Sequence, residues 1–190
     1  MSPITLNLDS VRLTDEQFFQ LCSNNRELQF ERSANGDLTI MSPTGGETSY
    51  SNAGLTAQLW VWNESSQLGK VFDSSGGFKL PNGADRSPDA AWIPLERWNT
   101  LTPQQRQRFL PLCPDFVIEL RSPSDSLAAL RRKMEEYRDN GTRLGWLLDR
   151  ASGNVEIYRP GRGVEVLENP TVLSGEEVLP GFVLNLQSIW

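Results

Sequence analysis

Two acidic residues in short apolar segments are the strongest candidates for chemistry in this sequence. Asp89 follows Ser87-Pro88 at the start of one apolar run, and Glu119 stands inside the apolar run 115–121. A charged side chain within an apolar strand is costly to bury unless it is paired or binds a metal ion. Each acid also has an ordinary explanation, because Asp is common in turns after proline and Glu119 could pair with Arg121 at a sheet edge.

The composition narrows the chemistry that these acids could perform. The chain contains no histidine, which excludes Ser-His-Asp and Cys-His catalysis, histidine zinc sites and histidine general bases. Its two cysteines, Cys22 and Cys113, are too few for a structural zinc site and are expected to be core residues. Hydrolysis would therefore rest on carboxylates, Lys, Arg, Tyr or Ser, and carboxylates with a hard cation such as Mg²⁺ are the natural choice.

Length, hydropathy and charge predict a single domain over residues 1–190. Hydrophobic residues make up 38% of the 190 residues, and no apolar run approaches the roughly 18–20 residues of a membrane span. The N-terminus lacks a basic start followed by an apolar stretch, so we expect a cytoplasmic protein without a signal peptide. The net charge of −6 counts against nonspecific binding of nucleic acid, unless a local basic surface does the binding.

Periodicity and turn signals predict the elements that must position the two acids. A capping box of Thr14 and Gln17 starts a short helix, and Asn35-Gly36 joins two strands of a hairpin. The other expected elements are a long helix at 47–67, a strand hairpin at 70–72 and 78–80, strands at 88–93, 115–121, 144–149 and 155–158, a small helix from Thr102 that ends before Pro111, a helix at 124–140 capped by Ser124 or Asp125 and stopped by Gly141, and short strands and turns from Val164 to Trp190.

The order of these elements predicts an α/β (α+β) fold. A strand, a helix and a strand over 115–149 imply a parallel crossover, and the mixed sheet should carry helices on both faces. Alternation within 115–121 sends Phe116, Ile118 and Leu120 to one face and Glu119 to the other.

Lys133 and Glu47 flank the buried faces of their predicted helices. Lys133 lies roughly 80° from the centre of its helix's apolar stripe, so its ammonium can reach toward the end of the preceding strand. Glu47 stands near the start of the long helix. Spacing alone favours a solvated flank for Lys133, and the ordinary alternative for Glu47 is a first-turn acid favoured by the helix dipole.

Several motifs occur together in one order that resembles the Uma-two family of restriction-endonuclease-like proteins. They are SPDAAWIP at 87–94, PDFVIELRSPSD at 114–125 and RRKMEEYRDNGTRLGWLLDR at 131–150, preceded by IMSPTGGETSYSNAGLTAQLWVW at 40–62. The resemblance covers the chain from about Leu28 to Tyr158. It implies the PD-(D/E)XK nuclease fold, a restriction-endonuclease-like mixed sheet flanked by helices, here with an added N-terminal helix and hairpin.

The resemblance also implies roles for individual residues. Asp89 corresponds to the aspartate of the motif and Glu119 to its second acid. The lysine expected two residues later is Arg121 here, which departs from the motif, and Lys133 in the following helix could supply the lysine instead. Glu47 would be the helix acid of such folds.

These roles imply a metal-dependent reaction. One or two Mg²⁺ (or Mn²⁺) ions would be held by Asp89 and Glu119, with the carbonyl of Leu120 as a further oxygen ligand, and would polarise a phosphate and activate a water. Lys133 would orient that water or stabilise developing charge, whereas Arg121 suits phosphate binding better than proton transfer.

Three functions remain open from the sequence. The first is a Mg²⁺-dependent endonuclease that acts on nucleic acid, with DNA as the expected substrate and a homodimer as an arrangement suggested by analogy. The second is a nuclease-fold protein that no longer cleaves and serves as a binding or regulatory module, which the net charge and Arg121 favour. The third is a soluble scaffold whose acids pair with Arg121 and Lys133, because a fold alone does not fix a function.

Overall fold

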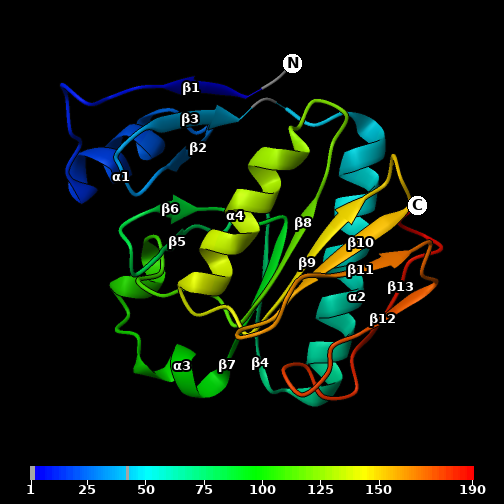
Figure 1. The fold of residues 1–190 in the computed structure, drawn as a ribbon. Helices are drawn as coiled ribbons and strands as arrows, with labels where there is room; N and C mark the ends of the chain where they lie inside the picture. The colour runs from blue at the N-terminus through cyan, green and yellow to red at the C-terminus, as the bar shows by residue number, and fades with distance from the viewer. Residues whose placement is uncertain (1–2, 42) are drawn as a thin grey trace.

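The fold was analysed in a computed structural model, which describes residues 3–41 and 43–190. Figure 1 shows the arrangement of its elements. In chain order they are β1 (Ile4–Leu6), α1 (Asp15–Asn24), β2 (Gln29–Arg32), β3 (Leu38–Met41), α2 (Gly46–Ser66), β4 (Gly69–Asp73), β5 (Phe78–Lys79), β6 (Asp85–Arg86), β7 (Ala90–Pro94), α3 (Leu95–Thr100), the 3₁₀ turn η1 (Gln105–Gln107), β8 (Phe116–Leu120), α4 (Leu127–Asp139), β9 (Leu144–Asp149), β10 (Asn154–Tyr158), β11 (Glu165–Glu168), β12 (Val172–Ser174) and β13 (Val183–Asn185).

A six-stranded sheet in the order β11-β10-β9-β8-β7-β4 forms the centre of the molecule. β8 and β9 pair in parallel, and every other pair in this sheet is antiparallel. The helix α4 makes the crossover between the two parallel strands, as predicted. It covers one face of the sheet, while α2 and the C-terminal strands cover the other (Figure 1). The predicted mixed sheet between helices is confirmed.

The strand β8 alternates as its sequence predicts. Phe116, Ile118 and Leu120 belong to the hydrophobic core beneath α2, whereas Val117 belongs to the core beneath α4. Both faces are covered, so all five residues of β8 are buried, including Glu119. The fold therefore places a carboxylate in the layer between the sheet and α4.

A second sheet, in the order β1-β3-β2-β6-β5, packs on α1. The predicted β2–β3 hairpin is confirmed, but the predicted hairpin of residues 70–72 and 78–80 is wrong. β4 pairs with β7 in the central sheet, while β5 pairs with β6 in the second one. The chain crosses between sheets at Gly76-Gly77, where a Cβ on Gly77 would overlap the ring of Phe109. Glycine is required by this close approach rather than by a hairpin turn.

Helix ends agree with the sequence in part. The Thr14–Gln17 capping box is present, and Gly141, with φ of +115°, follows the end of α4. The cap of α4 is Ser126, not Ser124 or Asp125, because Asp125 instead accepts hydrogen bonds from the Ser122 N–H and hydroxyl. The small helix expected from Thr102 is only the 3₁₀ turn η1, preceded by α3.

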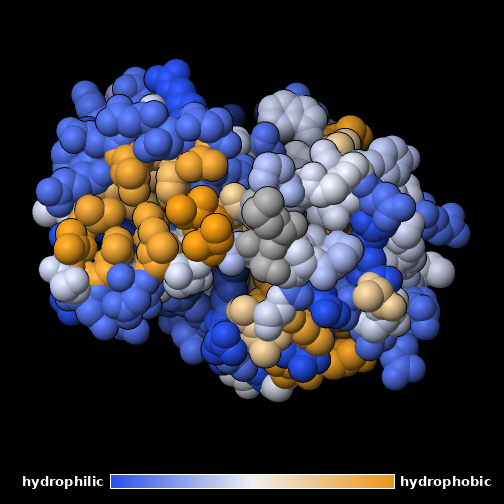
Figure 2. Space-filling view, turned by 90° about the horizontal axis from the view of Figure 1, so that it is seen from above, coloured by the Kyte–Doolittle hydropathy of each residue, from blue (hydrophilic) through white to orange (hydrophobic). Residues whose placement is uncertain are grey.

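One hydrophobic region of the surface stands out in the view from above (Figure 2). Seen from above, hydrophobic side chains gather on the side that carries the second sheet and α1 (Figure 2). The exposed large hydrophobic residues of this part of the chain are Ile4, Leu6, Val11 and Leu28. Among the described helices, none combines the length and the apolar character needed to cross a membrane.

Candidate active site

The ammonium of Lys133 lies between two buried carboxylates from different sheets. Its Nζ is 2.8 Å from Glu119 Oε1 and 2.7 Å from Glu31 Oε1. It also donates a hydrogen bond of 3.4 Å to the carbonyl of Ser87. The predicted reach from the flank of α4 to the end of β8 is thus observed. The contact joins the central sheet, through Glu119, to the second sheet, through Glu31.

Asp89 lies beside this group, where the ladder between β7 and β8 stops. The last pair of that ladder is Ala90 with Ile118. One step further, Asp89 Oδ2 accepts a hydrogen bond of 2.7 Å from the N–H of Leu120, so a side chain replaces the next backbone partner. Asp89 Oδ1 accepts a second bond of 2.7 Å from the amide of Asn52 in α2. Asp89 makes no ion pair with any residue that the structure describes.

Tyr137 and Arg86 complete the surroundings of the carboxylates. The fully buried Tyr137 donates a hydrogen bond of 3.1 Å to Glu119 Oε1, the oxygen that also faces Lys133. Glu31 accepts hydrogen bonds from Arg86, at 3.2 Å, and from the N–H of Ser87, at 3.0 Å. Glu119 Oε2 has no hydrogen-bond partner among the described residues, so one oxygen of this carboxylate is left for another ligand.

The pKa values of the three acidic residues in the site are shifted from their usual values. Burial raises the pKa of Glu119 to about 8, with a further contribution from the negative charges of Asp89 and Glu31 and against the pull of Lys133. Burial also raises the pKa of Asp89 above its usual range, although the Leu120 N–H and Lys133 oppose it. Burial alone would raise the pKa of Glu31, but Lys133 and Arg86 outweigh it and hold that pKa low.

Lys133 responds in the opposite sense to its burial. Desolvation alone would lower its pKa, but Glu119 and Glu31 raise it above the usual lysine value. The group of Asp89, Glu119 and Glu31 therefore faces two cations, Lys133 and Arg86, and Arg86 is shared with Glu136. When all three acids are ionised, their negative charge exceeds the positive charge of Lys133 and Arg86, and a bound cation would offset the difference.

Two residues singled out in the sequence lie apart from this group. Arg121 donates a hydrogen bond of 2.8 Å to Asp149 at the end of β9. Glu47 has an exposed carboxylate that faces Arg150 at 3.4 Å. The position two residues after Glu119 is thus occupied by an arginine engaged elsewhere, while Lys133 contacts Glu119 from α4.

Three neighbours of the site were not anticipated: Glu31, Asn52 and Tyr137. Glu31 occupies the polar side of an alternating hairpin strand, which predicts an exposed residue, but the edge of the central unit covers that side. Tyr137 fits the apolar stripe of α4, and nothing in that pattern reveals a hydroxyl directed at Glu119. Asn52 has no distinguishing signal in the sequence. A search for polar residues on the helix turns beside the two acids would have included it.

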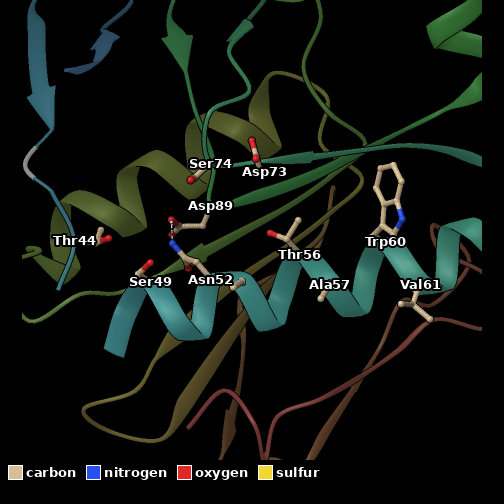
Figure 3. Close-up of a pocket in the computed structure, with 11 residues that line it drawn as sticks. Thr44, Ser49, Asn52, Thr56, Ala57, Trp60, Val61, Asp73, Ser74 and Asp89 are labelled. Carbon is tan, nitrogen blue, oxygen red and sulfur yellow. Dashed lines mark hydrogen bonds between the residues drawn. The ribbon is translucent and has the colours of Figure 1, made fainter. Parts of the chain in front are cut away.

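A groove runs along the open face of α2 and reaches Asp89 (Figure 3). Its volume is about 510 Å³. The residues that line it are Thr44, Ser49, Asn52, Ala53, Thr56, Ala57, Trp60, Val61, Asp73, Ser74 and Asp89. Asp89 is therefore the site carboxylate that solvent and a ligand reach from this side.

The donors at the inner end of the groove fit a hard cation. Asn52 Oδ1 is buried and has no hydrogen-bond partner among the described residues, although it lies on the amide that holds Asp89. With Asp89 and the unpartnered oxygen of Glu119, it offers the oxygen donors that Mg²⁺ prefers. Within the described part of the chain, no three acidic, cysteine or histidine side chains converge as a complete metal cage. Mg²⁺ commonly binds through only one or two carboxylates and keeps several waters.

Comparisons with known proteins give one family match and one solved structure of similar fold. Residues 15–187 match the sequence profile of the Uma2 family, whose description is "Putative restriction endonuclease". A solved structure, described as "a putative nuclease belonging to DUF820 from Anabaena variabilis ATCC 29413", superposes with a TM-score of 0.76. It is 19% identical in sequence, and the match covers 93% of this chain and 97% of that one. No curated protein matches the chain.

Proposed function

Because the chain belongs to the Uma2 family, we propose that it is a Mg²⁺-dependent endonuclease that hydrolyses phosphodiester bonds of nucleic acid at Asp89 and Glu119. The observation that carries the proposal is the meeting of Asp89, Glu119 and Lys133 where β7 and β8 end beside α4. Three separate segments supply these groups, and Asp89 opens into a groove. An ordinary structural ion pair would not need a carboxylate that has no cationic partner.

The metal ligands in this proposal are Asp89, Glu119 and the carbonyl of Leu120. The N–H and C=O of one strand residue point to the same side, and the Leu120 N–H points at Asp89, so its carbonyl lies on that side as well. When bound, Mg²⁺ (or Mn²⁺) would neutralise charge on the phosphate and lower the pKa of a bound water.

Lys133 acts in this proposal as a positive charge rather than as a base. Its two carboxylate partners raise its pKa, so it keeps its proton and can donate to a phosphate oxygen as negative charge develops. Glu31 positions the ammonium from the second sheet. Arg121, held by Asp149, contributes through phosphate contact at most and is not assigned to the reaction centre.

Cleavage by acid-to-alanine variants tests the proposal. Wild-type protein with Mg²⁺ or Mn²⁺ should nick plasmid, single-stranded DNA or RNA, and Asp89→Ala and Glu119→Ala should each remove cleavage while the circular dichroism spectrum persists. Glu135→Ala, which changes an exposed acid on α4, is the matched control and should cleave like the wild type. Activity that survives in both acid variants would place the site elsewhere.

Metal binding can be measured without cleavage. Because a ligand that binds only the folded protein stabilises it, millimolar Mn²⁺ should raise the Tm of the wild type and should raise it less for Asp89→Ala. A protein that binds the metal and nucleic acid but cleaves neither DNA nor RNA would instead be the inactive binding module. Equal Tm values with and without Mn²⁺ would count against the metal-dependent nuclease.

A further inference from the structure

The outer end of the groove on α2 carries an exposed aromatic ring, that of Trp60. Trp60 is 51% exposed and Val61 beside it is 65% exposed, although both line the groove. The other tryptophan of this turn, Trp62, packs against Trp92 and Phe182 in the core. Figure 3 shows the indole of Trp60 standing free of its helix at one end of the groove, with Asp89 toward the other.

The floor between these two ends is formed by small side chains. Ala53, Thr56 and Ala57 lie along the same face of α2, and their size leaves the groove open. Asn52, which contacts Asp89, and Trp60 are eight residues apart on one helix. A rise of about 1.5 Å per residue makes this separation about 12 Å. At about 3.4 Å per stacked nucleotide, the distance corresponds to about three or four nucleotides.

The charges of the groove decide which part of a nucleic acid could enter it. None of the residues described as lining it is basic, and Asp73 and Asp89 are acidic. Phosphates would be repelled along this floor, so a strand would have to turn its bases inward and keep its backbone outside. The hydroxyls of Ser49, Thr56 and Ser74 offer hydrogen bonds to base edges. Any of the bases can stack on an exposed indole, but only a base that is not already stacked within a duplex is free to do so.

We propose that the groove from Asp89 to Trp60 binds unpaired nucleotides beside the scissile phosphate, with one base stacked on Trp60. This inference rests on the proposed function for the class of ligand, and it adds a preference for single-stranded or locally opened nucleic acid. Stacking acts between the indole of Trp60 and a base, so it can contribute to binding in a chain of net charge −6.

Binding in the absence of divalent metal tests this inference apart from cleavage. Fluorescein-labelled single strands of 20 thymidines or 20 uridines, and a 20-base-pair DNA duplex, would be titrated with protein in EDTA while anisotropy is recorded. Trp60→Ala should raise the Kd for both single strands about tenfold or more, and Trp60→Phe should restore most of the affinity. A loss with only one strand would assign the groove to DNA or to RNA, and duplex binding should not change.

Tyr50→Ala is the matched control. Tyr50 is a 73% exposed aromatic residue on the same helix, but it lies outside this groove, near Arg150 and Trp190, so its removal should leave the Kd unchanged. Equal Kd values for the wild type and Trp60→Ala, or no binding of single strands by the wild type, would overturn the inference. If Asp89→Ala loses cleavage but Trp60→Ala binds single strands as the wild type does, the proposed nuclease function would be supported and this inference refuted. If single-strand binding depends on Trp60 but the wild type cleaves no nucleic acid, this inference would be supported and the proposed nuclease function refuted.

Discussion

At the residue scale, the site depends on how one ammonium is shared. Lys133 faces Glu119 and Glu31 at nearly equal distances, 2.8 and 2.7 Å, so neither carboxylate alone determines its position. Tyr137 fixes the same oxygen of Glu119 from the other side. A charge held by several partners is preorganised for a phosphate, because little reorganisation is needed when negative charge develops.

Lys133→Ala should therefore lower the rate of cleavage far more than it lowers affinity. Loss of one preorganised donor costs about 10²–10³-fold in rate in comparable sites. Single-turnover kinetics at saturating enzyme would give the rate, and anisotropy in EDTA the affinity. Arg132→Ala, on the exposed neighbour of Lys133, should change neither quantity. A rate of Lys133→Ala equal to that of the wild type would refute this role of the ammonium.

At the element scale, the side chain of Asn63 ties the C-terminal end of α2 to the central sheet. Asn63 Oδ1 accepts hydrogen bonds from the Gly69 N–H, at 3.1 Å, and from the indole of Trp92, at 2.9 Å. Its amide donates to the carbonyl of Gly69, at 3.1 Å. Gly69 itself has no room for a Cβ, which would overlap the Ile93 carbonyl and the Trp92 ring. The groove keeps its shape because α2 cannot shift along the sheet.

Asn63→Ala should lower the free energy of unfolding by about 2–4 kcal/mol, because it leaves buried polar groups of Gly69 and Trp92 without partners. Urea denaturation followed by tryptophan fluorescence would measure the change. Ser65→Ala, on the exposed side of the same helix turn, should cost less than about 0.5 kcal/mol. A cost of similar size in the two variants would show that these hydrogen bonds do not hold the helix.

At the scale of the whole molecule, a buried ion pair joins the N-terminal unit, which consists of α1 and β1–β3, to β6 within the second sheet. The guanidinium of Arg32 in β2 lies 2.6 Å from Asp85 in β6 and 2.6 Å from Asp15 in α1. Arg32 and Asp85 are both buried, and they form the single paired position between β2 and β6. Arg32 follows Glu31 directly in the chain, so β2 carries both this ion pair and a carboxylate of the candidate site.

Arg32→Ala should destabilise the protein by about 3–5 kcal/mol, because it leaves the carboxylate of Asp85 buried without its partner. Arg108→Ala removes an exposed pair with Glu16 and should cost no more than about 1 kcal/mol. Thermal and urea unfolding would measure both. At a temperature where Arg32→Ala is still folded, its cleavage rate should also fall, since Glu31 loses its support. If Arg32→Ala were as stable as the wild type, the ion pair between Arg32 and Asp85 would not be what holds the N-terminal unit in place.

The sequence predicts the central unit better than it predicts the attachment of the second sheet. Local signals sufficed for β8, α4 and β9, because strong alternation and a helix of the right length leave one crossover arrangement. They failed at 70–80, where two short strands near a glycine pair suggested a hairpin but long-range pairing took them to different sheets. Pairing between distant strands leaves no local trace in strands as short as β4, with five residues, and β5, with two.

The candidate site divides in the same way. Asp89, Glu119 and Lys133 could be singled out because charged residues beside or within apolar segments stand out, and because their motifs occur in order. Glu31 could not, because a glutamate on the polar side of a hairpin strand looks the same whether water or another unit covers it. Its role depends on a tertiary contact that no spacing within residues 28–40 encodes.

The ion pair of Arg32 has a consequence for when the candidate site is completed during folding. Glu31 reaches Lys133 only after the N-terminal unit has docked, so a nascent or partly unfolded molecule lacks one wall of its reaction centre. A nuclease that is complete only when every part has folded carries its own safeguard, since damaged or half-made copies would cut little.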